Sequence, residues 1–323
     1  MRFPRLLVAL AAAGCLTACA TPAPAPSPPS GEGFPVTVEN CGRQVTFDAP
    51  PRRALVLGGE AGSLVRAAGA VERIATFGAI DGEPLGAAQA DLGARAQLPV
   101  PGSGAVAREV IIAQQPDVVI TFGLNETTPE DLAAAGIPAL QLAGRCPGDP
   151  GPRGLEAMYA DIETYGRVFG TRPQATAAVA QLRERVAAAG RRVAGIGAGR
   201  GAAALFVGAP DSPLGAYGRL STAHQQLEAL GFRNVFDEVA KRHFEPGTEQ
   251  VISAAPEVVV ALYQASGSTE QTVRSSLAAR AELAGVPALA KGSVLPLDYF
   301  YAGNGLLAVD GLERLADQLA ALP

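Results

Sequence analysis

Short apolar runs alternate with amphipathic stretches along most of the chain. Residues 53–58 (Arg-Ala-Leu-Val-Leu-Gly) and 204–208 (Ala-Leu-Phe-Val-Gly) have the length and composition of buried strands. Each run is followed by a helical pattern, at 63–68 and 222–230, and each helix ends at a glycine suited to a left-handed cap. Strands that alternate with helices predict parallel sheets with right-handed crossovers. Further strands are predicted at 139–143 and 293–297.

One pattern of hydrophobic and polar residues occurs twice, at 109–120 and 249–260. In both stretches a glutamate opens a short helix, a proline ends it, an acid follows, and β-branched or similar residues run into a buried strand. This repeat predicts two lobes of similar construction.

A long helix is predicted at 173–194, between the two repeats. This stretch is rich in helix formers, has no proline inside it, and places Val179, Leu182 and Val186 on one face. About 22 residues at about 1.5 Å each give roughly 33 Å, enough to cross a domain boundary. We therefore expect the helix to join the lobes; the alternative is an ordinary surface helix inside one domain.

Composition then limits the classes of function. The 323 residues are 48% hydrophobic, which is enough to build cores for two domains and excludes a disordered chain. There are 26 Lys and Arg against 31 Asp and Glu, and no basic run is longer than a dipeptide. Nucleic acid is therefore not an expected partner.

The amino terminus has the features of an export signal. A short basic start is followed by an apolar stretch at 6–14 that is too short to span a bilayer, and then by Leu16-Thr17-Ala18-Cys19. This end resembles the bacterial lipoprotein box, which implies removal of 1–18 and lipidation of Cys19. The alternative is an ordinary secretory signal cleaved elsewhere. Residues 19–33 are rich in Pro, Ala and Ser, which predicts an extended tether to the membrane.

Two further cysteines, Cys41 and Cys146, remain in the exported chain. In an oxidising compartment we expect them to form a disulfide, the alternative being two free thiols. No metal site is predicted, because the chain has no C-x-x-C motif and its only histidines, His224 and His243, do not form a pair at helical spacing.

The lipobox, the tether, an expected hairpin at 36–47, the repeated glutamate segments and the joining helix together resemble a substrate-binding lipoprotein of an ABC importer. The class is the one with a rigid connecting helix, which handles ferric siderophores, haem and cobalamin. The resemblance implies an α/β, class III periplasmic binding protein fold: two Rossmann-like lobes with parallel central sheets, joined by one long helix. The expected parts are an N-terminal lobe at 34–153, a helical connector at 154–197 and a C-terminal lobe at 198–323.

The resemblance also implies docking onto a membrane permease, whose ATPase is a separate protein. In this family an acidic residue on each lobe forms a salt bridge to permease arginines, and Glu109 and Glu249 match those positions. Two separated carboxylates would fix the protein at two points on a basic surface. The alternative is that each acid only complements its helix dipole, an effect of about 0.3 to 1 kcal/mol.

Ligand-binding residues are expected at the carboxyl ends of the strands, where loops face the cleft. Aromatic planes there can pack against a flat ligand, and arginines can pair with anionic oxygens. The alternatives are aromatic residues in the core, a solvated arginine at 145 and a surface histidine at 243. The candidates are Phe77, Phe122, Arg145, Tyr217, Arg219, Arg242, His243, Tyr299 and Tyr301, with Phe244 and Phe300 beside them.

A glycine run at 195–202 contains G-x-G-x-x-A, which is also found in dinucleotide-binding proteins. Here the run follows a helix and precedes a strand, the reverse of the order that such binding needs, so we predict a connector. The chain has no G-x-S-x-G, H-E-x-x-H or P-loop motif. We therefore expect no enzyme activity, although an extracytoplasmic enzyme or redox protein on two such lobes is the alternative.

The expected function is capture of a ferric siderophore in the cleft by a lipid-anchored, monomeric protein that has no cofactor of its own. Haem or cobalamin binding is the alternative within the class, and an adhesin or signalling receptor is another. The cleft arginines favour an anionic carboxylate or catecholate chelate over a neutral hydroxamate. The absence of tryptophan disfavours cobalamin.

Overall fold

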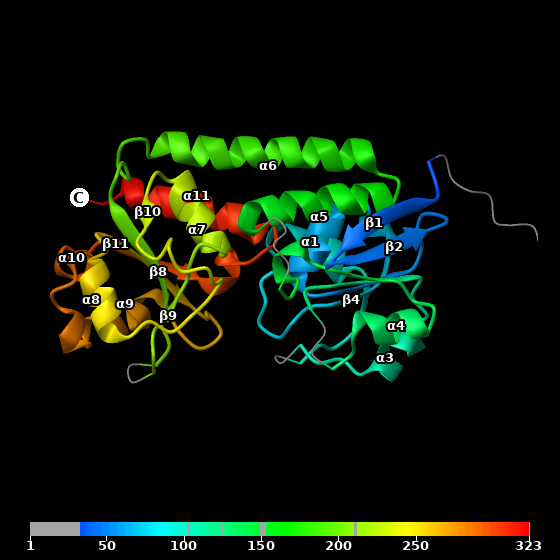
Figure 1. Ribbon diagram of the computed structural model, residues 1–323, viewed down its shortest axis with the longest axis horizontal. Coiled ribbons are helices and arrows are strands. Elements are labelled where there is room, and N and C mark those ends of the chain that lie inside the picture. Colours follow the sequence, from blue (N-terminus) through cyan, green and yellow to red (C-terminus); the bar gives the residue numbers. More distant parts are fainter. Residues whose placement is uncertain (1–32, 102–103, 124–125, 149–152, 210–211, 323) are drawn as a thin grey trace, which may run out of the picture.

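The protein consists of two α/β lobes that lie side by side beneath one long helix (Figure 1). The computed structural model describes residues 33–101, 104–123, 126–148, 153–209 and 212–322. The predicted signal segment at 1–18, Cys19 and all of the predicted tether except Gly33 lie outside the described residues. Within the described ranges, no helix is long and apolar enough to cross a membrane.

The N-terminal lobe is built on a five-stranded sheet of order β5-β4-β3-β6-β7, in which every pair is parallel. Such a sheet is buried on both faces, which explains why its central strands are continuous apolar runs. The strands are β3 (Ala54–Leu57), β4 (Ile74–Gly78), β5 (Ala96–Gln97), β6 (Val118–Thr121) and β7 (Ala139–Gln141).

Helices cover both faces of this sheet. They are α1 (Gly59–Ala67), α2 (Gln89–Gly93), α3 (Arg108–Ala113), α4 (Pro129–Ala134) and α5 (Gly154–Val168). Side chains of β3 alternate between the faces: Val56 packs in the core that contains α1 and α5, whereas Leu55 and Leu57 pack with Ile111 of α3 and Leu132 of α4.

A hairpin of β1 (Val36–Asn40) and β2 (Arg43–Phe47) lies at the β7 edge of the lobe. Its two turn residues, Cys41 and Gly42, have φ of 50° and 75°, the geometry of a tight hairpin turn. The Asn40 side chain exchanges two hydrogen bonds with the backbone of Gln141. Cys41 forms a disulfide with Cys146, with 5.1 Å between their Cα atoms, which confirms the predicted pairing.

The C-terminal lobe repeats this plan. Its parallel sheet has the order β10-β8-β11-β12, and β9 pairs antiparallel with β8. The strands are β8 (Gly201–Phe206), β9 (Gly215–Ala216), β10 (Arg233–Asn234), β11 (Val258–Tyr263) and β12 (Val294–Asp298). The helices are α7 (Thr222–Ala229), α8 (Thr248–Ala254), α9 (Glu270–Ala278), α10 (Pro287–Ala290) and α11 (Leu307–Ala320).

The two repeated segments fold in the same way. Helix α3 leads to strand β6, which pairs with β3. In the same way, helix α8 leads to strand β11, which pairs with β8. Each helix is followed by a left-handed residue, Gln115 with φ of 51° or Ala255 with φ of 45°, directly before a proline. Because proline disfavours a helical residue before it, both helices end at the same point of the repeat. The predicted duplication is confirmed.

Helix α6 (Arg172–Arg192) runs along both lobes (Figure 1). In its first half, Ala175 and Val179 pack into the N-terminal core, and near its end, Ala189 packs into the C-terminal core. At Gly190 the helix lies so close to the Ala229 carbonyl of α7 that a Cβ atom would collide with it. The predicted connecting helix is therefore confirmed, within two residues at each end.

Some predicted boundaries are wrong. Helix α1 begins at Gly59 rather than at 63, because it starts directly after the turn that ends β3. Strand β8 begins at Gly201, so the end of the predicted glycine connector is a buried strand paired with β10 and β11. Strand β7 ends at Gln141, and residues 143–145 form a 3-10 turn instead of more strand.

Candidate ligand-binding cleft

A cavity of about 480 Å3 lies between the lobes, at the carboxyl ends of the strands. Parallel strands leave their loops at this edge, which is where such sheets bind ligands. Most of the predicted ligand residues meet there, although they come from loops far apart in the sequence. They are Phe122, Arg145, Tyr217, Arg242, His243 and Tyr299, with Phe300 beside them.

Three of the predicted ligand residues lie outside this cavity. Phe77 is fully buried in the N-terminal core, because strand alternation directs its ring onto Gly62 of α1. Tyr301 packs in the C-terminal core, where Arg314 covers its ring and donates a hydrogen bond to its hydroxyl. Arg219 is exposed and does not line the cavity. These three residues therefore do not lie with the other candidates around the cavity.

The cavity also contains residues that the sequence analysis did not select. Glu60, Glu83, Phe206 and Gln264 follow or end the strands β3, β4, β8 and β11, so the strand-end rule applied to them as well. Glu60 was missed because the glycines around it made the start of α1 hard to recognise. Ile80, Ala302 and Gly303 also line the cavity.

Arg145 and Glu60 form an ion pair in the wall of the cavity. The Nη2 atom of Arg145 lies 3.2 and 3.1 Å from the two carboxylate oxygens, and the Glu60 side chain is only 10% exposed. Glu60 raises the pKa of the Arg145 guanidinium and thereby stabilises its charged form. The Nε atom of Arg145 is buried and has no hydrogen-bond partner among the described residues.

The same Glu60 carboxylate reaches the other lobe. Its Oε1 atom accepts the backbone N–H of Asn304 at 2.9 Å, and Ser63, one turn further along α1, accepts the N–H of Leu306 at 3.2 Å. A Cβ atom at Gly303 would collide with the Glu60 carboxylate. These hydrogen bonds hold the start of α1 against the loop that leads into α11.

Glu83 organises the same corner of the cavity. Its carboxylate accepts the backbone N–H groups of Gly59 and Glu60, at 2.7 and 3.0 Å, and so caps the first turn of α1. Burial raises the pKa of Glu83, and the nearby charge of Glu60 adds to the effect. The cap holds Glu60 where it can meet both Arg145 and Asn304.

Arg242 is the second guanidinium in the cavity. Its side chain reaches solvent in the cleft, and no described side chain forms an ion pair or hydrogen bond with it. Partial desolvation, followed by repulsion from Arg145, lowers the pKa of Arg242. Arginine remains protonated at physiological pH, so this charge is available to a ligand.

Asp161 of α5 fixes the turn that carries Arg145. Both carboxylate oxygens of this buried acid accept the backbone N–H of Ala143, at 3.2 and 3.1 Å. Burial raises the pKa of Asp161 well above its usual value. Together with the disulfide at Cys146, this contact fixes the backbone on both sides of Arg145.

Aromatic rings form the remaining walls. Tyr299 meets Phe206 edge to face at 6.1 Å between ring centroids, and Tyr217 meets His243 at 5.2 Å. On the opposite lobe, the Phe122 ring lies directly against Gly58, where φ is 94° and a side chain would not fit. The cavity therefore offers π faces from both lobes to a flat or apolar ligand.

His243 is the histidine that lines the cavity. Desolvation, followed by the charge of Arg242, lowers the pKa of His243 and so favours its neutral form. In the part of the chain that the structure describes, no group of three His, Cys, Asp or Glu side chains could hold a metal ion.

Glu109 and Glu249 do not line this cavity. Each is the second residue of its helix, α3 or α8, and both are exposed. The large apolar side chains that the described residues expose are Val110, Ile112 and Ile252, which lie on the same two helices. Each lobe thus presents an acid beside apolar surface.

A family model described as "Periplasmic binding protein" matches residues 56–299, which extends from within β3 to the end of β12 and includes the connecting helix. The chain belongs to the periplasmic binding protein family. Its two lobes, parallel central sheets and single long connecting helix are the class III form of this fold. No curated protein matches the chain.

Several solved periplasmic binding proteins have the same fold. A protein described as an ABC-type Fe3+-hydroxamate transport system from Saccharomonospora viridis is 35% identical, with a TM-score of 0.75 over 89% of this chain and 100% of that one. A haem-binding protein from Pseudomonas aeruginosa is 22% identical, with a TM-score of 0.65 over 84% and 94% of the two chains. A vitamin B12-binding protein from Vibrio cholerae is 16% identical, with a TM-score of 0.61 over 84% and 97%.

As a periplasmic binding protein, the chain is a substrate-binding protein and not an enzyme. The family acts outside the cytoplasm, binds a small molecule and delivers it to an ABC permease. This assignment removes the alternative of an enzyme or redox protein that the glycine run had left open.

Proposed function

We propose that this periplasmic binding protein captures a ferric siderophore in the cleft between its lobes. The observation that carries the proposal is the cavity itself, in which aromatic rings from both lobes surround two guanidinium groups. Aromatic faces suit the organic shell of an iron chelate, and a guanidinium suits its iron-bound oxygens. The chelator supplies the iron ligands, so the protein needs no metal-binding cluster of its own.

The charges of the cavity narrow the class of chelate. Arg145 is compensated by Glu60, and Glu83 lies beside them, so the two arginines and two glutamates balance formally. Of the two arginines in the cavity, Arg242 is the one that lacks an acidic partner among the described residues. We therefore infer a chelate of low net charge with at least one oxygen directed at Arg242, in place of the strongly anionic catecholate expected from the arginines alone. The name of the Saccharomonospora viridis relative, which refers to Fe3+-hydroxamate, agrees with this class.

The test is calorimetric titration of the purified protein with a ferric hydroxamate, a ferric catecholate, haemin and cyanocobalamin. We expect the ferric hydroxamate to bind most tightly, and Arg242→Ala to weaken it by about ten-fold or more, since a charged hydrogen bond contributes about 1.5 to 3 kcal/mol. Arg219→Ala is the matched control, because Arg219 is exposed and outside the cavity. Absence of binding by every ferric chelate, or equal effects of the two substitutions, would refute the proposal.

Haem is the second candidate ligand, and one observation favours it. Tyr217, His243 and Tyr299 all line the cavity, and phenolate and neutral imidazole are axial ligands of haem iron. If haemin alone bound and produced a shifted Soret band that was lost in His243→Ala or Tyr217→Phe, haem would replace the siderophore as the proposed ligand.

We also propose that the protein is held at the membrane by a lipid on Cys19 and docks on its permease through Glu109 and Glu249. The two acids are exposed at equivalent positions of the two lobes. Val110, Ile112 and Ile252 beside them supply apolar area for the same contact. An acid beside an apolar patch on each lobe is the pattern of a two-point protein interface.

A further inference from the structure

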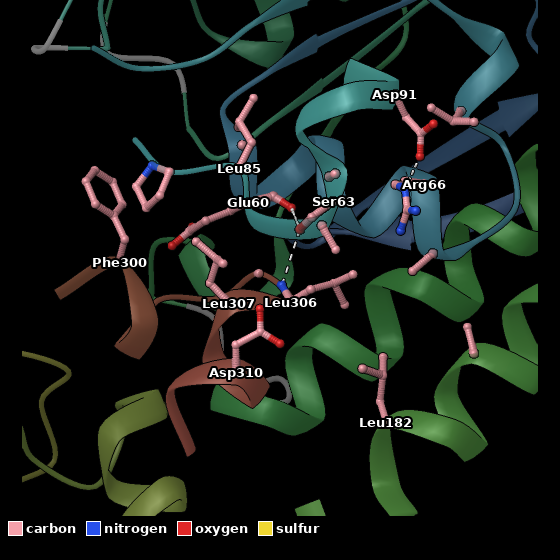
Figure 2. Close-up of a pocket in the computed structure, with 18 of the residues that line it drawn as sticks. Glu60, Ser63, Arg66, Leu85, Asp91, Leu182, Phe300, Leu306, Leu307 and Asp310 are labelled. Atoms are coloured by element: carbon pink, nitrogen blue, oxygen red, sulfur yellow. Dashed lines mark hydrogen bonds and ion pairs between the residues drawn. The ribbon is translucent and has the colours of Figure 1, made fainter. Parts of the chain in front are cut away.

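A second cavity, of about 510 Å3, lies behind the wall of the cleft. We call it the back cavity; Figure 2 shows it between the first turns of α1, the middle of α6 and the start of α11. Glu60, Glu83 and Phe300 line both cavities and so form the wall between them. Its volume is within the usual range for small-molecule sites.

The floor of the back cavity is apolar. Leu85 comes from the loop after β4, Leu182 from α6 and Leu307 from α11, and their side chains are drawn around the same space in Figure 2. Ala67 and Val71 extend this surface. A ligand with an apolar body is therefore favoured, because its binding removes apolar surface from water.

The rim of the back cavity is acidic. Its lining has four carboxylates but only two guanidiniums, and both guanidiniums are already engaged: Arg66 with Asp91, and Arg185 with Asp310 at 2.7 Å. Arg185 is also shared with Glu313, at 2.7 Å, which leaves Asp310 incompletely neutralised. Glu60 is paired with Arg145 in the wall of the cleft, whereas Glu83 has no cationic partner among the described residues. An anionic ligand would therefore meet only cations that are already paired, whereas an organic cation would meet the uncompensated charge of Glu83 and of the two acids that share Arg185. The carboxylates are those of Glu60, Glu83, Asp91 and Asp310.

We propose that the back cavity is a second ligand site, which binds a small organic monocation with an apolar body. Its walls come from the N-terminal lobe, the C-terminal lobe and the connecting helix, so a bound cation contacts all three. Such a ligand stabilises the observed spacing of the lobes, and it touches the cleft only through the shared wall of Glu60, Glu83 and Phe300. The proposal does not depend on which molecule the cleft binds.

The probe is phenethylamine, which is protonated at pH 7, and its matched neutral analogue is 2-phenylethanol. For a probe of this size we expect a dissociation constant on the order of 1 mM by calorimetry. The neutral alcohol is expected to bind about ten-fold more weakly or not at all. Equal binding of the two molecules would contradict the cationic class, and no binding of the amine would overturn the site.

Two substitutions locate the binding. Ala178→Phe places a ring in the back cavity from a half-buried position of α6 and is expected to weaken phenethylamine binding by about ten-fold or more. Ala180→Phe adds the same ring at an exposed position of α6 outside the cavity and is expected to leave binding unchanged. If Ala178→Phe did not fold, Ala87→Phe would fill the cavity from its opposite, exposed loop. Retention of full affinity in a folded, filled variant would refute the proposal.

Discussion

Glu60 illustrates how much of the cleft depends on a single side chain. Its carboxylate pairs with Arg145, accepts the N–H of Asn304 from the opposite lobe, and lines both cavities. The carboxylate is 10% exposed and the guanidinium 28% exposed, so water screens the pair only partly. Breaking such a pair leaves a charge without compensation, which costs more than the pair itself contributes.

We expect Glu60→Gln to lower the free energy of unfolding by about 1 to 3 kcal/mol, measured by urea denaturation. The amide retains the shape of the side chain and an acceptor for Asn304 but removes the charge opposite Arg145. The matched control is Glu156→Gln, because Glu156 pairs with Arg183 and both side chains are about half exposed, at 53% and 52%. That change should cost less than about 1 kcal/mol. Equal losses in the two variants would show that the Glu60 pair has no special role.

At the scale of elements, helices α3 and α8 form the proposed docking surface. We expect the double variant Glu109→Arg with Glu249→Arg to weaken binding to the permease by about 100-fold or more, since each reversed charge replaces an attraction with a repulsion. The measurement is stimulation of ATP hydrolysis by the reconstituted transporter. Affinity for the cleft ligand should not change, because both acids lie outside the cavity.

The control for docking reverses two exposed acids elsewhere, Glu184 on α6 and Glu238 before α8. This variant carries the same change in net charge, so it separates a specific contact from long-range electrostatic attraction. A similar loss of stimulation in both double variants would contradict docking through α3 and α8.

The elements that the sequence predicted best are those with a strong pattern of their own. Helix α6 has helix formers throughout and no proline after its first turn, and the short helices of the repeated segments are followed by Pro116 and Pro256. The start of α1 was missed because Gly58, Gly59 and Gly62 have low helix propensity. There the helix is stabilised by the Glu83 carboxylate, which lies in a loop more than twenty positions away and leaves no local signal.

The sequence could predict those site residues that lie at the end of a strand or directly after it. Phe122 and Tyr299 continue strands directly and were found by that rule. Phe77 fits the rule equally well but faces the core, since the direction of a side chain depends on the face to which the pleat assigns it. The ion pair between Arg145 and Glu60 joins residues 85 positions apart, so only the folded chain brings them together.

At the scale of the whole molecule, the two lobes are coupled by two helices that each pack into both cores. Helix α6 contributes Val179 to the N-terminal core and Ala189 to the C-terminal core. Helix α11 does the same, with Val309 on one side and Leu315 on the other. If α6 and α11 unfolded together with one lobe, apolar side chains in the core of the other lobe would be exposed to water.

We therefore expect the ligand-free protein to unfold in one transition by differential scanning calorimetry, with equal calorimetric and van't Hoff enthalpies. Lobes joined only by a flexible linker would melt separately. Two resolved transitions, or a van't Hoff enthalpy near half of the calorimetric one, would mean that the shared helices do not couple the lobes.

The disulfide between Cys41 and Cys146 makes the structure of the cleft dependent on oxidation. Cys146 is the immediate neighbour of Arg145, and Cys41 forms the tip of the amino-terminal hairpin. The backbone that presents this guanidinium is thus covalently linked to the hairpin at the β7 edge of its lobe only once two thiols have been oxidised. The disulfide does not form in a compartment where thiols stay reduced. The binding surface therefore reaches its final structure only in the oxidising compartment in which the protein meets its cargo.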